Sequence, residues 1–363
     1  MSEFATVVPR SHPVRLAGLA TALPPHALEQ RALQPRLARL FAHASSHRWL
    51  ANLVDQAGIE RRYAVRPADW FERPRGWPER AAAYAEGAGA LFVDAAERAL
   101  AAAGWRAREV DTVVTVSSTG LATPTLEARA GRRLGLRADV RRVPVFGLGC
   151  AGGVTGLALA RRLAGAEPGA RVLVVCVETC TLNLQTQRPT KADLVAAVLF
   201  ADGAAAACVV ADAAPATVGL GDGVEHLWPD SLDVMGWEVR DDGLGVVFDR
   251  AIPAFVDAHL ADAVAAGLTA SGLAHADVAR FVCHPGGPKV LAAIERVLAL
   301  PPDRLDHERA VLRACGNMSS PTVLFVLERV LRDPPTGTLM LAALGPGFTA
   351  SLLPITVAGA RDG

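Results

Sequence analysis

The chain has 363 residues, 51% apolar and 20% charged, a composition that fits a folded protein with a large core rather than a disordered chain. Its 37 basic and 37 acidic residues give a net charge of zero, so no overall electrostatic field favours nucleic acid or an anionic membrane surface as a partner. The six cysteines form no CxxC pair or zinc-site spacing, and the N-terminus lacks a signal-peptide pattern. We therefore expect a cytoplasmic protein with free thiols and no metal.

Helical and β-strand patterns alternate along the first part of the chain. Residues 13–40 predict a short strand and a helix, and residues 69–80 predict a polar surface loop. After that loop we expect helices at 81–103, 123–135 and 152–165, which alternate with strands at 110–118, 140–146 and 171–178. Two further short elements are expected within 195–212. The strands are apolar without a period of two, as in sheets covered on both faces. This alternation predicts the α/β class.

An uncharged stretch near the C-terminus, residues 336–360, has the length of a membrane span. Gly345-Pro346-Gly347 interrupts it, and each half has the length of a strand. Two buried strands around a turn are the better interpretation, and we expect no stable membrane insertion.

The sequence contains an internal repeat. Residues 101–116 and 269–284 share one order of helix, glycine, polar loop and apolar strand, at an offset of 168. Residues 157–177 and 324–344 share helix, proline-containing loop and strand at an offset of 167. Two long matches at nearly one offset predict a duplicated α/β unit, with halves at 1–220 and 221–363.

The stretch FGLGCAGG, residues 146–153, has two interpretations. It matches the G-x-G-x-x-G dinucleotide fingerprint, and Glu178 ends the next strand, as an acidic ribose-binding residue would. It also places Cys150 at a glycine-rich turn before a helix, where backbone N–H groups favour a thiolate. In that second interpretation the glycines leave room for a substrate carbonyl.

Two further residues support the nucleophile interpretation. His284 ends an apolar strand and precedes Pro-Gly-Gly-Pro, a position where α/β folds form sites. With the repeat offset of 167, Cys150 aligns with Asn317. We therefore expect the two residues at equivalent turns, each before an equivalent helix. Asparagine cannot act as a base, but its amide can donate to an oxyanion or a carbonyl.

GCAGG, HPGGP, GNMSS and GPGFT, in this order, resemble the type III polyketide synthases, the chalcone-synthase-like family. The resemblance extends from about residue 14 to 356 and implies a thiolase fold, a duplicated αβαβα layered sandwich that works as a homodimer. The stretches DWFERPRGWPER, KADLVAAVLFADGAA and PDSLDVMGWEVRDDGLGVVFDRAIP are more similar still to bacterial alkylresorcinol and alkylpyrone synthases, which take long acyl starters.

The resemblance implies roles for individual residues. Cys150 matches the acyl-carrying nucleophile, His284 and Asn317 match the pair that polarises the malonyl thioester, and Phe200 matches an aromatic gatekeeper. Further substrate-binding positions that carry over are Ser118, Thr119, Thr123, Cys180, Asn183, Trp237, Val246, Phe248, Ser319 and Gly347, with Thr123 reaching across the dimer interface and Val246 replacing a second aromatic gatekeeper. The basic CoA contacts on the N-terminal helix do not carry over, since Trp49, Asn52 and Gln56 occupy that region; the CoA-binding candidates are Arg48, Lys289, Gly286 and Gly287.

The resemblance thus implies iterative decarboxylative condensation of malonyl-CoA onto an acyl-CoA starter held on Cys150, followed by closure to an alkylpyrone or alkylresorcinol, without a cofactor. Two alternatives remain at this point. A ketoacyl synthase of the initiating type would perform a single condensation. A protein of another class would be a non-catalytic thiolase-fold scaffold or an NAD-binding module.

Overall fold

The computed structural model describes residues 13–212, 214 and 217–359. Their strands form a ten-stranded sheet, ordered β12-β13-β14-β8-β1-β7-β6-β4-β5, with β9 paired to β14. Its first half holds β1 (Val14–Ala22), β4 (Thr112–Val116), β5 (Arg141–Val145), β6 (Arg171–Thr179) and β7 (Asp202–Ala211). Its second half holds β8 (Val218–Leu220), β9 (Val224–Leu227), β12 (Val278–Cys283), β13 (Gly337–Gly345) and β14 (Thr349–Val357).

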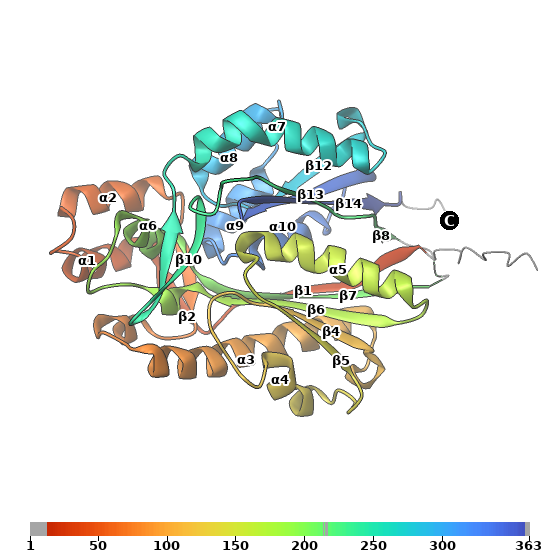
Figure 1. Cartoon of the computed structure of the whole chain (residues 1–363), viewed down its shortest axis with the longest axis horizontal. Coiled ribbons are helices and arrows are strands. Elements are labelled where there is room, and N and C mark those ends of the chain that lie inside the picture. Colours follow the sequence, from red (N-terminus) through yellow and green to blue (C-terminus); the bar gives the residue numbers. More distant parts are fainter. Residues whose placement is uncertain (1–12, 213, 215–216, 360–363) are drawn as a thin grey trace, which may run out of the picture.

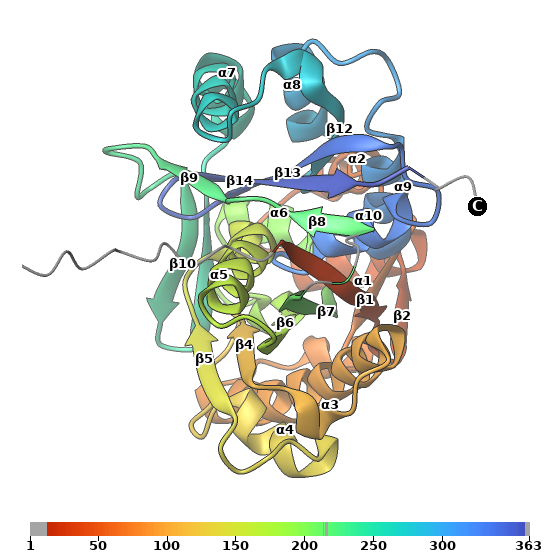
Figure 2. The same ribbon diagram turned by 90° about the vertical axis from the view of Figure 1, so that its right-hand side faces the viewer.

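Helices and sheet halves alternate in five layers (Figure 1). The outer layers are α3 (Trp77–Ala103) with α4 (Leu126–Leu134), and α7 (Ile252–Ala270) with α8 (Pro288–Val297). The middle layer, between the two halves of the sheet, holds α5 (Gly152–Ala166) and α10 (Thr322–Val330), and Figure 2 shows the same layering from the side. The predicted αβαβα thiolase-type sandwich is confirmed.

The remaining elements gather at the end of the sandwich on the left of Figure 1. They are α1 (Gln30–Leu40), α2 (His47–Gln56), α6 (Lys191–Leu199), α9 (Asp306–Cys315), and two hairpins, β2 (His26–Glu29) with β3 (Arg61–Ala64) and β10 (Met235–Arg240) with β11 (Gly243–Phe248). This end of the molecule therefore carries the loops and short elements, while the other end is mostly regular sheet and helix.

The apolar run of β6 has a direct structural cause. Leu173, Val175 and Val177 pack in the cluster formed with α3, while Val174 and Cys176 pack in the cluster formed with α5. Both faces of the strand are thus buried between helices, which is why the sequence shows no polar alternation there.

The repeat is confirmed down to its turns. Gly104 and Gly272 end α3 and α7 in the left-handed region, at φ 67° and 68°. After each glycine comes one turn of 3-10 helix, in which the carboxylate of Glu109 or Asp277 accepts a hydrogen bond from a backbone N–H three residues earlier, at 2.7 Å in both cases. The predicted boundary between the halves, after residue 220, falls at the end of β8.

The structure shortens one predicted loop and confirms one predicted pair of strands. The loop expected over 69–80 is shorter, because Ala68–Glu72 form a 3-10 helix and α3 begins at Trp77 with Pro78 in its first turn, a position that proline favours. The uncharged C-terminal stretch forms β13 and β14 around a turn, as predicted. Within the described residues, no helix combines the length and the apolar character that a membrane span requires.

Candidate active site

Cys150 lies in a 3-10 turn, Gly149–Ala151, that leads directly into α5. Gly149 has a φ of 48°, a conformation that favours glycine. The hydroxyl of Ser118 accepts hydrogen bonds from the N–H groups of Gly147 and Gly149, at 3.0 and 3.4 Å. The sequence thus folds this turn tightly enough to fix the buried Cys150 thiol at the start of the helix.

Three glycines of this turn, Gly149, Gly152 and Gly153, make room for protein rather than for a ligand. A Cβ on Gly149 would lie 2.7 Å from Pro346, one on Gly152 2.6 Å from Val116, and one on Gly153 2.3 Å from the carbonyl oxygen of Ser320. The prediction that the glycines admit a thioester is therefore wrong for Gly149, Gly152 and Gly153, whereas a Cβ on Gly147 would meet nothing within 4 Å. Because the second and third glycines of the fingerprint, Gly149 and Gly152, pack against protein, the dinucleotide interpretation is removed. Their role is to let α5 approach the loop that carries Asn317.

His284 follows β12, and its backbone N–H donates to the carbonyl of Ala342 on β13 at 2.8 Å. Its side chain is buried, and neither ring nitrogen has a hydrogen-bond partner among the described residues. Burial lowers the pKa of His284 to about 3, because a lone imidazolium would lose its hydration. The ring is thus available to a partner that enters the cavity.

Asn317 lies between α9 and α10 and is 2% exposed. Its backbone pairs with the segment around Phe200: its N–H donates to Leu199 at 2.9 Å, and its carbonyl accepts from Ala201 at 2.8 Å. Its side-chain oxygen accepts from the Ser319 N–H at 2.8 Å, and its NH₂ donates to the Gly286 carbonyl at 3.2 Å. These contacts fix the amide orientation, and the amide also contacts the Cys150 thiol.

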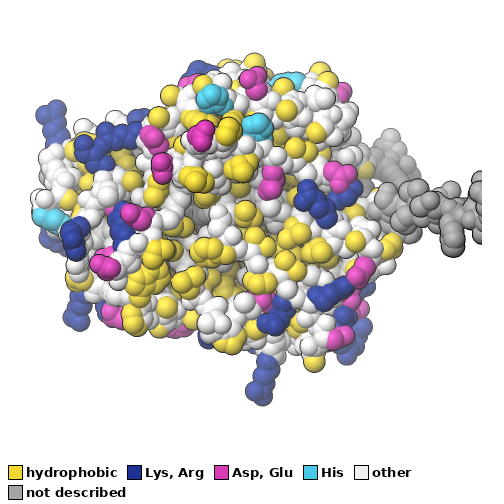
Figure 3. Space-filling view, viewed as in Figure 1, with side chains coloured by type: hydrophobic (Ala, Val, Ile, Leu, Met, Phe, Trp, Pro, Cys, Tyr) yellow, Lys and Arg dark blue, Asp and Glu magenta, His cyan; other side chains and the backbone are white. Residues whose placement is uncertain are grey.

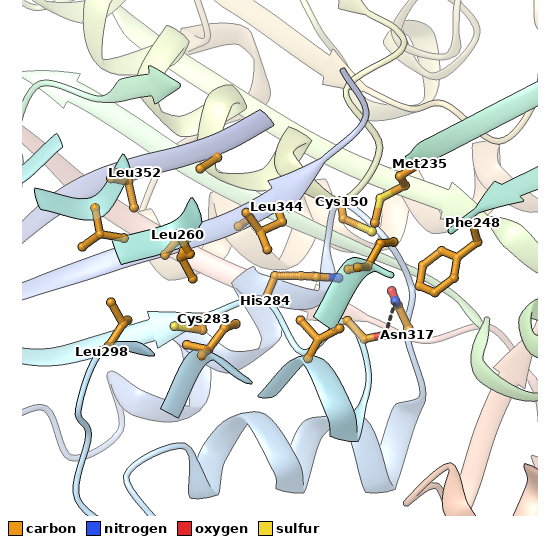
Figure 4. Close-up of a pocket in the computed structure, with 18 of the residues that line it drawn as sticks. Cys150, Met235, Phe248, Leu260, Cys283, His284, Leu298, Asn317, Leu344 and Leu352 are labelled. Atoms are coloured by element: carbon orange, nitrogen blue, oxygen red, sulfur yellow. Dashed lines mark hydrogen bonds between the residues drawn. The ribbon is translucent and has the colours of Figure 1, made fainter. Parts of the chain in front are cut away.

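The three side chains line one cavity, which we call the main cavity (Figure 4). In the close-up, a ring nitrogen of His284 points toward Cys150, and the Asn317 amide lies beside them. The Cys150 Sγ lies 3.7 Å from the Ser319 hydroxyl, on the same loop as Asn317. The equivalent turns that hold Cys150 and Asn317 thus meet, as the repeat indicated. Phe200 and Phe248 also line the cavity, beside these catalytic candidates.

Burial raises the pKa of the Cys150 thiol to about 12, and contacts with Ser319 and Asn317 oppose this only in part. A second cause is Glu178, a fully buried carboxylate whose charge disfavours a thiolate. The raised pKa of Cys150 disfavours a thiolate beside a neutral His284, and the lowered pKa of His284 disfavours an imidazolium beside a neutral Cys150. Neither group is therefore expected to be charged on its own, which opposes the expected thiolate–imidazolium pair. No hydrogen bond joins the two side chains among the described residues.

Glu178 is a site residue that the sequence pointed to for the wrong reason. It ends β6 and accepts hydrogen bonds from the Ser118 N–H at 2.9 Å, the Thr119 hydroxyl at 2.7 Å and the Ser320 hydroxyl at 2.8 Å. Burial raises its pKa to about 7 despite these bonds. It ties the segment before the Cys150 turn to the loop after Asn317.

A second cavity begins on the other side of Phe200 and extends toward α1 and α6. The Phe200 and Trp237 rings meet edge to face, with centroids 6.0 Å apart, and Trp237 is paired with Val246 across the β10–β11 hairpin. The predicted residues that line this second cavity are Cys180, Asn183, Phe200, Trp237 and Val246.

Five predicted substrate-binding residues line neither cavity. The hydroxyls of Ser118 and Thr119 are bonded to the Cys150 turn and to Glu178, so the prediction that they line the cavity is wrong in this structure. Ser319 contacts Cys150 but lies behind it, and Thr123 is exposed. Gly347 packs instead against protein, since a Cβ there would lie 2.7 Å from the Thr349 hydroxyl.

An open groove leads to the main cavity, and Gly286 and Val290 line both. The predicted Lys289, Gly286 and Gly287 line this groove, together with Trp49, Asn52 and Gln56 of α2. Arg48 does not line it and is exposed at the start of α2, so its role as a CoA contact stays a prediction without support from the groove. Lys191 and Arg250 line it and were not selected, although Lys191 is one of two lysines in the chain, both of which fall here.

Comparisons with known proteins agree with this architecture. Residues 9–213 match the family model for the N-terminal domain of chalcone and stilbene synthases, and residues 220–353 match that for their C-terminal domain. A 1,3,6,8-tetrahydroxynaphthalene synthase of Streptomyces peucetius subsp. caesius is 40% identical, over 97% of this chain and 95% of the relative. An alpha-pyrone synthesis polyketide synthase-like protein of Mycobacterium tuberculosis is 29% identical, over 92% of this chain and 88% of that protein.

Solved structures give the same result. The 1,3,6,8-tetrahydroxynaphthalene synthase of Streptomyces coelicolor A3(2) superimposes with a TM-score of 0.89 at 27% identity, over 95% of this chain and 100% of that one. PKS-I of the brown alga Ectocarpus siliculosus gives a TM-score of 0.89 at 25% identity, over 96% and 99%. Because both family models match and together span both halves, the chain belongs to the chalcone and stilbene synthase family and is a type III polyketide synthase, an acyltransferase.

Proposed function

We propose that this synthase loads an aliphatic acyl group from acyl-CoA onto Cys150, extends it with malonyl-CoA over several rounds and closes the product to an alkylpyrone or alkylresorcinol. The observation that carries the proposal is the meeting of Cys150, His284 and Asn317, from three distant segments, in one largely apolar cavity. Each step uses these side chains and the two thioesters, so the chemistry needs no metal or redox group.

In loading, the proton of the Cys150 thiol passes to His284, and the sulfur attacks the carbonyl carbon of the acyl-CoA. The bond from that carbon to the CoA sulfur then breaks, and the CoA sulfur leaves with the proton from His284. In extension, the malonyl thioester oxygen accepts hydrogen bonds from His284 and from the second N–H of Asn317. The bond to the carboxylate breaks, carbon dioxide leaves, and the resulting enolate carbon attacks the acyl carbonyl and releases the Cys150 sulfur.

The coupling of Cys150 to His284 predicts a pH effect. Proton transfer creates both charges side by side, at a helix N-terminus, so the pair ionises more easily than either group alone. The rate of Cys150 alkylation by iodoacetamide is expected to be near its plateau at neutral pH in the native protein. In His284→Gln the thiol keeps its raised pKa of about 12, so the rate is expected to be low at neutral pH and to climb about tenfold per pH unit as the thiolate forms.

Identical pH profiles for the two proteins would contradict this coupling. Cys150→Ala gives the background from the other buried cysteines, and quantifying the Cys150 peptide by mass spectrometry separates the sites.

We propose that the groove holds the CoA portion of both thioesters, with its phosphates near Lys191, Arg250 and Lys289. All three cations are exposed, so each contact is expected to be modest. Lys289→Gln should raise KM for malonyl-CoA about three- to tenfold, with kcat nearly unchanged, because the contact is the same in the ground and transition states. Arg48→Gln is the matched control outside the groove. A rise in KM for Arg48→Gln alone would show that the phosphates lie elsewhere.

Product mass tests the function as a whole. The tetrahydroxynaphthalene synthase relatives favour a second candidate, in which the product is a naphthalene without an alkyl tail. In this second candidate we propose that malonyl units alone build the product. The apolar wall of the main cavity supports an aliphatic starter instead. With decanoyl-CoA and labelled malonyl-CoA, we expect a decanoyl-derived triketide or tetraketide; a product made of malonyl units alone would support the second candidate, and a single condensation would support an initiating ketoacyl synthase.

We also propose a homodimer formed through the face that carries β5, the edge strand of the first half of the sheet. Phe146 and Leu121, beside this strand, are 58% and 57% exposed, and Figure 3 shows apolar side chains across this face. The exposed Thr123 lies close by in sequence, where it could reach the partner's cavity. Sedimentation of the protein as a monomer at micromolar concentration would contradict this proposal.

A further inference from the structure

The main cavity continues well beyond the catalytic side chains. Its lining extends from Cys150 and Asn317 at one end to residues of α7 and α8 at the other. Figure 4 shows His284 between these ends, with Cys150 on one side and Leu260 and Leu298 on the other. The reaction steps described above use only the first end. We call the remainder, between the sheet and helices α7 and α8, the helical arm.

The helices supply one continuous apolar wall of the helical arm. Val290 and Ile294 of α8 and the C-cap residue Leu298 are spaced four residues apart and form a single stripe. Leu260 and Val264 form the corresponding stripe on α7. Eight residues of helix from Val290 to Leu298 span about 12 Å, which suits an alkyl chain of medium length lying along the stripe.

The sheet supplies a floor of small residues. Cys283 of β12, Ala342 of β13 and Ala350 of β14 line the arm, and all three pack in the layer under α7 and α8. In the same layer the large side chains of Met340 and Phe348 are fully buried. Large side chains therefore fill this layer beside the helical arm, and small side chains leave space within the arm.

The lining selects for hydrocarbon. Away from Cys150, His284 and Asn317, no charged or hydroxyl-bearing side chain lines the main cavity within the described residues. A polyketone chain or a phosphate would lose hydrogen bonds to water there without replacement, whereas a saturated chain loses none.

We propose that the aliphatic tail of the starter lies in the helical arm while its carbonyl carbon is bonded to the Cys150 sulfur. This inference rests on the proposed function. It assigns the tail to the α7–α8 side of the active site and leaves the second cavity, across Phe200, to the growing polyketide.

The test measures loading of Cys150 by intact-protein mass, using acetyl-, hexanoyl-, decanoyl- and tetradecanoyl-CoA. Ala350→Leu and Val264→Phe obstruct the arm from the floor and from α7, and each is expected to slow decanoyl loading about tenfold or more while acetyl loading changes little. Leu298→Ala extends the far end and should move the preference toward tetradecanoyl-CoA. Two obstructing variants are made because one of them could fail to fold, and thermal unfolding of each checks this.

Ala197→Leu obstructs the second cavity and supplies the competing result. If it changes the chain-length preference while Ala350→Leu and Val264→Phe do not, the tail lies in the second cavity and the inference is overturned. If the native protein loads no acyl-CoA at all onto Cys150, the proposed function itself fails. Opposite shifts in the obstructing and extending variants, with acetyl loading retained, support the helical arm as the starter site.

Discussion

Cys150→Ala is expected to abolish acyl loading and to lower chain extension by at least about a thousandfold, since loss of a covalent nucleophile removes the intermediate itself. His284 and Asn317 remain in the variant, so slow decarboxylation of malonyl-CoA should persist. Intact-protein mass after incubation with decanoyl-CoA reports loading, product mass reports extension, and carbon dioxide release reports decarboxylation. The three readouts separate the nucleophile from the residues that bind the malonyl thioester.

Cys208→Ala is the matched control. Cys208 is buried in β7 and lines none of the three cavities, so its removal should leave loading intact. Extension by Cys150→Ala at a rate near that of the native protein would remove Cys150 from the mechanism. Loading that disappears in Cys208→Ala, with its fold retained, would mean that the acyl group is carried elsewhere.

Local patterns in the sequence predicted the α/β class and the duplicated unit, and the family resemblance supplied the layered sandwich. Apolar strands alternate with helices, and Gly104 and Gly272 end equivalent helices in equivalent conformations. The same repeat predicted that the turns holding Cys150 and Asn317 would be equivalent. In the structure these turns precede α5 and α10, which pack in one layer between the two halves of the sheet.

The features that the sequence did not predict depend on contacts between distant segments. The glycines around Cys150 match a phosphate-binding fingerprint, yet Pro346 and Ser320, about 170 to 200 residues away, occupy the space beside them. The helical arm has no sequence motif, because Ala342 and Ala350 are ordinary strand residues until α7 and α8 are placed over them. Spacing along one chain gives the period of an element but not which small residues leave a cavity unfilled.

Asn317→Asp is expected to lower malonyl-CoA decarboxylation and chain extension by about a hundred- to a thousandfold, the usual cost of losing one oxyanion donor. The substitution keeps an oxygen that can accept the Ser319 N–H, so the loop is preserved. It removes the amide donor and places a negative charge where the enolate charge develops. Loading of Cys150 from decanoyl-CoA should fall much less, because it does not pass through this enolate.

The two readouts distinguish a donor role from a merely structural one. A structural role for Asn317 would lower loading and decarboxylation together, since Asn317 also pairs with the backbone around Phe200. Gln30→Glu converts another fully buried amide, which lines none of the three cavities, into a carboxylate that Arg62 faces at 2.9 Å, and it serves as the control for replacing a buried amide by a carboxylate. Decarboxylation by Asn317→Asp within about twofold of the native rate would exclude the amide as an oxyanion donor. The enolate would then depend on His284 alone, the other side chain in the cavity able to donate to it.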